Sequence, residues 1–153
     1  MKRKLDELET WVQRPDRHAA AVSSWSIHKQ VEHTALVARQ ILELVEGLEA
    51  GTAGEPTGRL RWPAHAVLAM GWIPRGKGVA PSSVLPGEAP DPAAIRAILD
   101  DTRARLRTHA PARGGNRAPH PHFGGMTARQ WTRFLGIHTH HHIKIIRDID
   151  AKA

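Results

Sequence analysis

Two histidines near the C-terminus, His138 and His142, are the residues of this chain best placed to do chemistry. They stand in the sequence IHTHHHI, inside a segment whose apolar residues recur with helical spacing. At about 100° per residue they lie about 40° apart on a helix, one above the other. Trp131, Phe134 and Ile145 fall on the same face. Both imidazoles are therefore predicted to point into the protein interior, where an unpaired polar ring is costly.

A third histidine, His33, belongs to another predicted helix and lies toward the edge of its apolar stripe. One divalent metal ion bound by this ring together with His138 and His142 would satisfy all three. Three protein ligands leave one coordination position open for water or substrate, which is typical of catalytic zinc sites. A closed structural site needs a fourth ligand, for which His141 and His122 are the candidates. The alternative to metal binding is a polar core in which each imidazole is hydrogen-bonded to the backbone.

Other polar side chains have weaker assignments. Gln30 lies on the same side of its helix as His33 and is a candidate hydrogen-bond partner for it. His28 and the far-side imidazole at His140 are predicted to be exposed. In a loop rich in Gly and Pro, Arg75 and the nearby Lys77 are candidates to receive a carboxylate of an incoming molecule. An ordinary solvated loop is the alternative for those two cations.

Amphipathic helices must position these residues, and the sequence predicts four of them, at 2–14, 26–48, 91–108 and 127–150. Ser26 is a candidate N-cap, and Thr127 with Gln130 forms a capping box at the start of the last helix. A short helix is predicted at 61–72, between loops, and no strand is predicted. The expected fold is all-α, a four-helix bundle with a long crossover between the second and third long helices, in one domain spanning 1–153.

The amino-acid composition excludes cysteine-based functions and bears on nucleic-acid binding. The 153 residues include no cysteine, which excludes disulfides, thiolate metal sites and a cysteine nucleophile. The net charge of +7 raises the question of nucleic-acid binding. The basic residues are spread along the chain without interleaved aromatic residues, so a solvated surface is favoured and no nucleic-acid partner is expected. Neither a signal peptide nor a membrane-spanning segment is predicted, and a cytoplasmic location is expected.

Several motifs resemble those of the DinB/YfiT-like superfamily of metal-binding four-helix bundles. They are the dipeptide Trp-Ser ahead of His33 and the His-x-x-x-His spacing on the last helix. The segment HPHFGGMT at 120–127 and the loop PRGKG at 74–78 are similar to those of a DinB-like subfamily of unassigned function. The resemblance covers nearly the whole chain.

The resemblance implies an up-down-down-up bundle that binds one divalent ion through His33, His138 and His142. The ion is expected to be zinc or nickel, with iron and manganese as alternatives, and a homodimer is expected. Relatives act on small molecules, as thiol-dependent transferases and isomerases and a few hydrolases. We therefore expect a metal-dependent enzyme that activates water or a low-molecular-weight thiol. The alternative is a non-catalytic protein that binds a metal or a small ligand.

His122, just before the last predicted helix, is the candidate catalytic residue of the chain itself. A histidine at the mouth of a pocket could carry a proton between the reacting groups and solvent near neutral pH. A surface histidine in a proline-rich turn is the alternative. The sequence leaves these two readings open.

Overall fold

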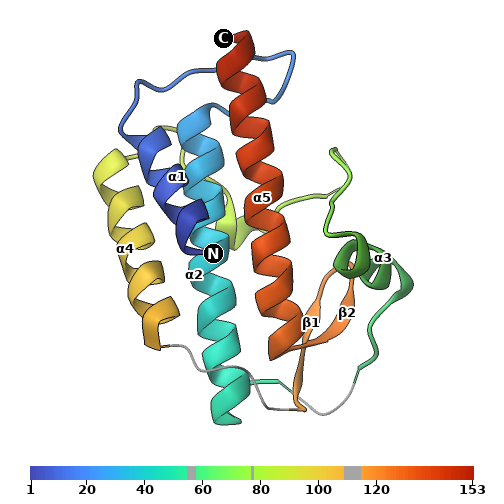
Figure 1. The fold of residues 1–153 in the computed structure, drawn as a ribbon. Coiled ribbons are helices and arrows are strands. Elements are labelled where there is room, and N and C mark those ends of the chain that lie inside the picture. The colour runs from blue at the N-terminus through green and yellow to red at the C-terminus, as the bar shows by residue number, and fades with distance from the viewer. Residues whose placement is uncertain (55–57, 77, 109–114) are drawn as a thin grey trace.

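Four long helices form a bundle in the computed structural model, which describes residues 1–54, 58–76, 78–108 and 115–153 (Figure 1). They are α1 (Lys2–Val12), α2 (Ile27–Ala50), α4 (Pro92–Thr108) and α5 (Ala128–Lys152). Helices α1 and α5 run in one direction and α2 and α4 in the other, so the order is up-down-down-up (Figure 1). The predicted all-α bundle with a long crossover is confirmed.

The helix ends follow from local side-chain chemistry. The Ser26 hydroxyl accepts a hydrogen bond from the Lys29 backbone N–H at the start of α2. Both hydrogen bonds of the predicted capping box form between Thr127 and Gln130 at the start of α5. Helix α2 ends where Gly51 adopts a left-handed φ of 73°. Each predicted helix agrees with the structure to within two residues at its ends. None of the helices in the described ranges has both the length and the apolar character needed to cross a membrane.

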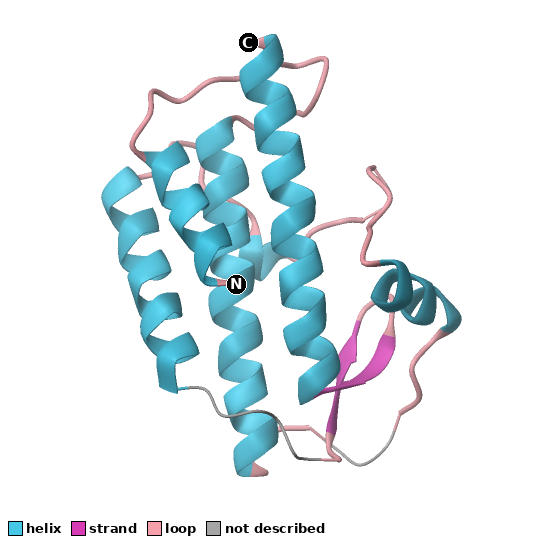
Figure 2. Cartoon of the chain, in the orientation of Figure 1, coloured by secondary structure: helices cyan, strands magenta, loops and turns pink. Residues whose placement is uncertain are grey.

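The crossover and the chain ahead of α5 add smaller elements beside the bundle: α3 (Trp62–Met70), the 3-10 turn η1 (Ser82–Val84), β1 (Arg117–His120) and β2 (Gly124–Thr127). Strands β1 and β2 form an antiparallel hairpin near the N-terminal end of α5 (Figure 2). The prediction that the chain has no strand was wrong. Each strand has only four residues, too few for an alternating apolar pattern to stand out in the sequence.

The hairpin is held by close backbone contacts with the segment ahead of α3. The Arg61 backbone N–H donates to the Phe123 carbonyl at 2.8 Å, and the Gly125 N–H donates to the Arg59 carbonyl at 3.2 Å. Gly124 has a φ of 76°, and a Cβ atom at this position would lie 2.4 Å from the Arg59 carbonyl oxygen. Glycine is therefore required here both for conformation and for space.

Two apolar clusters fill the interior, with polar residues between them. One cluster joins the C-terminal half of α2 and the N-terminal half of α5 with α3 and the hairpin. The other joins α1 and α4 with the remaining halves of α2 and α5. Along α5, His138 and His142 lie between Ile137 of the first cluster and Ile143 of the second, whereas His33 lies among the α2 residues of the second cluster. The fold therefore places three imidazoles in the middle of the α2–α5 interface.

Gly124→Ala is expected to destabilise the protein more than Gly76→Ala. Gly76 also has a positive φ, of 70°, but a Cβ there would meet nothing within 4 Å. Its replacement should therefore cost only backbone strain, about 1 kcal/mol. The clash with Arg59 should add at least about 1 kcal/mol at Gly124. Urea unfolding measures both losses, and equal losses would contradict the close approach.

Candidate metal centre

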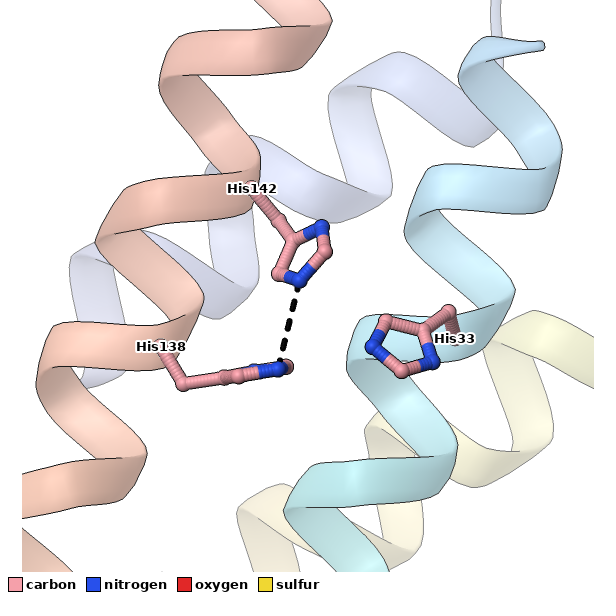
Figure 3. Close-up of side chains that lie close together, drawn as sticks. All are labelled: His33, His138 and His142. Atoms are coloured by element: carbon pink, nitrogen blue, oxygen red, sulfur yellow. Dashed lines mark hydrogen bonds between the residues drawn. The ribbon is translucent and has the colours of Figure 1, made fainter. Parts of the chain in front are cut away.

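The structure brings His33, His138 and His142 together, as the sequence predicts. One ring nitrogen from each can be chosen so that all three lie within 4.8 Å of one another. The ring centroids are 4.4 Å apart for His138 and His142, 4.7 Å for His33 and His142, and 5.2 Å for His33 and His138. Figure 3 shows the rings from α2 and α5 converging on one point between the helices. These three histidines could hold a metal ion.

Hydrogen bonds donated by Nδ1 decide which nitrogen faces the centre in two of the rings. His33 Nδ1 lies 2.7 Å from the Val84 carbonyl oxygen, and His142 Nδ1 lies 2.6 Å from Gln30 Oε1. Both partners are acceptors, so each Nδ1 carries the proton and donates it. In a neutral ring this leaves the Nε2 lone pair free. Metal-binding histidines in proteins are oriented in the same way by such outer hydrogen bonds.

Gln30 is itself held in place by the loop between α1 and α2. Its Nε2 donates to the Ser23 hydroxyl at 2.9 Å, and the same hydroxyl accepts from the Trp25 backbone N–H at 3.0 Å. These contacts fix the amide so that its oxygen faces His142. The predicted role of Gln30 beside a candidate ligand is thus confirmed, but its partner is His142 on α5 rather than His33 on its own helix.

His138 is the one ring of the three without an outer hydrogen bond. Its Nδ1 is buried and has no partner among the residues that the structure describes. Its Nε2 lies 3.2 Å from Nε2 of His142. Two nitrogens bound tetrahedrally to one zinc ion at about 2.0–2.1 Å would lie about 3.3 Å apart. The spacing of this pair therefore fits a shared metal ion, and nitrogen donors of this kind suit zinc, nickel, copper or iron.

Burial keeps these rings neutral. It lowers the pKa of His33, although the hydrogen bond to the Val84 carbonyl partly opposes this change. Burial also lowers the pKa of His138 and of His142 well below the usual range, and the neighbouring imidazoles lower both further. Only a neutral imidazole has a lone pair to give to a metal, so the site is prepared for binding at neutral pH.

The hairpin places His120, rather than His122, next to the aromatic residues of the site. His120 stacks on Phe123 with ring centroids 4.3 Å apart and packs against Phe134, which in turn contacts His138. Burial, with a further effect of His122, lowers the pKa of His120 to about 4. Sequence reasoning missed His120 because its position depends on a hairpin that was not predicted. His122 is exposed in the turn, and its role in proton transfer stays a prediction.

Among the surrounding histidines, the sequence predicted His140 correctly and His28 wrongly. His140 is exposed. His28 is buried, because its ring bonds to the Arg14 carbonyl at 3.0 Å in the loop that covers this end of α2. His141 packs edge-on against His142, with centroids 5.2 Å apart, and donates a hydrogen bond to the Ile73 carbonyl. A fourth ligand from His141 or His122 stays a prediction.

Of the two loop cations predicted to receive a carboxylate, only Arg75 is among the described residues. Arg75 forms a salt bridge of 2.6 Å with Asp148 of α5. It is therefore already paired, although both side chains are about half exposed, at 45% and 51%. Lys77 lies outside the described residues.

Comparison with known proteins identifies the family of the chain. A model of the DinB superfamily matches residues 4–146, which is nearly the whole sequence and includes all three histidines of the site. No curated protein and no solved structure matches the chain.

Metal-free protein is expected to lose stability as the pH falls below about 6.5. Unfolded histidines take up protons near that pH, whereas the folded state keeps His138 and His142 neutral, so stability is complete above it and falls below it. The loss is at most about 1.4 kcal/mol per pH unit for each ring. Denaturant unfolding between pH 7.5 and 5.0 measures the slope.

The matched variants for this experiment are His142→Gln and His65→Gln. His65 is exposed on α3, so its replacement should leave the pH slope unchanged, whereas His142→Gln should reduce it. The two comparisons concern the slope and not the absolute stability, which the lost contact with Gln30 will also change. An unchanged slope in His142→Gln would contradict the burial argument.

Proposed function

Because the chain belongs to the DinB superfamily and three of its histidines could hold a metal ion, we propose that it is a metal-dependent enzyme acting on a small molecule. His33, His138 and His142 would hold one divalent ion through their Nε2 atoms. The observation that carries this proposal is the pair of outer hydrogen bonds, from His33 to Val84 and from His142 to Gln30, which turn two Nε2 atoms toward the third ring.

An ion held by these three residues would supply Lewis-acid chemistry toward water or a low-molecular-weight thiol. The chain itself supplies the orientation of the ligands. The Val84 carbonyl holds His33 from the side of the crossover, and Gln30 holds His142 from the side of α2. Since the chain has no cysteine, any sulfur in the reaction comes with the small molecule.

We infer a role in proton transfer for the hairpin turn, which carries His120 and His122. The His122 backbone N–H lies 3.2 Å from His120 Nδ1, which accepts its hydrogen bond and leaves the proton of the neutral His120 ring on Nε2. His122 is exposed and can exchange protons with solvent. We assign His122 the role of proton shuttle and His120 the role of fixing the turn that carries it.

The identity of the ion follows only in part from its ligands. Three neutral imidazoles suit zinc and nickel, and they also accept iron, while manganese binds such sites more weakly. Zinc or nickel is the ion we expect in the purified protein, with iron or manganese as alternatives. A homodimer and the use of a thiol are further parts of the proposal that come from the resemblance to the family.

A non-catalytic metal-binding protein is the second candidate, and the burial of the site favours it. His33 and His142 are 4% and 8% exposed, and only His138 has a larger exposed part. A closed site would hold the ion without admitting a substrate. Assays of ester hydrolysis and thiol transfer, with the metal-loaded protein and with His138→Ala, separate the two candidates, since only an enzyme would show turnover that the variant loses.

Metal content tests the site directly. Protein purified without a His tag or a nickel column is expected to contain about one equivalent of divalent metal by plasma mass spectrometry, because three ligands define one site. His33→Ala should lose most of it, and His140→Ala, which removes an exposed imidazole next to the site, should keep it. Metal retained without His33 would mean that the histidines of α5 bind it alone, and the proposal would lose its main support.

Gln30 offers a more selective test, since it would not touch the metal itself. Gln30→Leu removes the acceptor of the His142 Nδ1 proton and is expected to weaken zinc affinity about 10- to 100-fold, measured by competition with a chromophoric chelator. Gln40→Leu is the matched control, because Gln40 is an exposed residue of the same helix whose side chain, among the described residues, donates a hydrogen bond to the Ser83 hydroxyl. Equal affinities for the two variants would show that Gln30 does not orient a ligand.

A further inference from the structure

A cavity of about 350 Å³ lies between α5 and the segment that follows α3. The three histidines of the candidate metal centre do not line it, so it is a separate feature of the molecule. Its lining comes from both sides: Trp72, Ile73 and Arg75 of the segment, and His140, His141 and Lys144 of α5. The volume is within the range of cavities that take small molecules, about 300–1,000 Å³.

The charges around this cavity are predominantly positive. Arg75 lines it from the segment after α3, and Lys144 lines it from α5. Two cations on the two sides of one cavity make a place where a negative charge would be stabilised.

The carboxylate beside the cavity, that of Asp148, is held by a weak salt bridge. Asp148 pairs with Arg75 at 2.6 Å, but both side chains are about half exposed, and such pairs contribute little in water. Lys144 is exposed and forms no salt bridge with any carboxylate of the described residues. An incoming carboxylate or phosphate could therefore be received by Lys144 and by Arg75, in competition with Asp148.

The walls also offer apolar surface. Trp72 is 52% exposed although it is a large aromatic residue, and Ile73 and Ile137 lie beside it in the lining. An aromatic or aliphatic group attached to the acid would pack against Trp72.

We propose that this cavity is a binding site for a small organic anion, with its acid group at Arg75 and Lys144 and its apolar part against Trp72. The site lies next to the candidate metal centre, since His141 contacts His142 edge-on at 5.2 Å. It does not depend on a bound metal, because none of the three candidate ligands lines it. The proposal therefore stands or falls independently of the enzymatic function proposed above.

Benzoate is the probe, and benzamide is its neutral control of the same shape. The Trp72 indole N–H resonance, assigned with Trp72→Phe, is followed in two-dimensional NMR spectra as each compound is added. Benzoate is expected to shift this resonance saturably and to bind at least about tenfold more tightly than benzamide, since each charged contact contributes about that much. Equal binding of the two compounds would overturn the proposal, because the cavity would then recognise shape without charge.

Charge variants locate the acid group. Arg75→Gln and Lys144→Gln are each expected to weaken benzoate binding about tenfold, whereas Lys152→Gln, at the exposed end of the same helix, should leave it unchanged. Asp148→Asn should tighten benzoate binding, because it removes the carboxylate that competes for Arg75. A partly unfolded variant would bind benzoate more weakly, so a gain in affinity cannot come from loss of folding. If Lys144→Gln behaves like Lys152→Gln, the proposal is wrong.

A last variant separates this cavity from the metal centre. Benzoate is itself a possible metal ligand, so the titration is repeated with His33→Ala. Unchanged binding supports the cavity as the site, even if the metal proposal fails. Loss of benzoate binding in His33→Ala would show that benzoate binds at the metal centre, which would overturn the inference.

Discussion

The interface between α2 and α5 has to accommodate three imidazoles among apolar side chains, and much of the remaining structure is arranged around that constraint. A buried ring nitrogen without a partner is costly, so each ring needs a hydrogen-bond partner or a shared ligand. His33 Nδ1 donates a hydrogen bond to the Val84 carbonyl, and His142 Nδ1 donates one to Gln30 Oε1. His138 has no such partner in the described residues, and its Nε2 meets that of His142.

Segments that look like mere connections therefore carry part of the site. The turn η1 in the crossover supplies the carbonyl that holds His33. The loop between α1 and α2 supplies the Ser23 hydroxyl that holds Gln30, which in turn holds His142. Rigid orientation of ligands is what a metal site needs, because a ring that rotates freely binds an ion weakly. The long crossover thus contributes to the geometry of the centre as well as to the topology of the bundle.

Helix α5 serves two different surfaces at once. His138 and His142 face α2, whereas His140, His141 and Lys144 line the cavity on the side of α3. The two surfaces meet where His141 packs against His142. A dense run of histidines on one helix is thereby divided between a neutral, buried cluster and a positively charged cavity. The division follows from helical geometry, which turns successive residues by about 100°.

The periodicity and capping residues of the chain were enough to predict the long helices and the shared face of His138 and His142, because these depend on residues within one or two turns of each other. Contacts between helices could not be predicted in the same way, since they depend on how α2 and α5 pack together. Packing paired Gln30 with His142 and buried His28 under Arg14. It also formed a hairpin from strands too short to show a pattern, and so brought His120 beside the aromatic residues of the site.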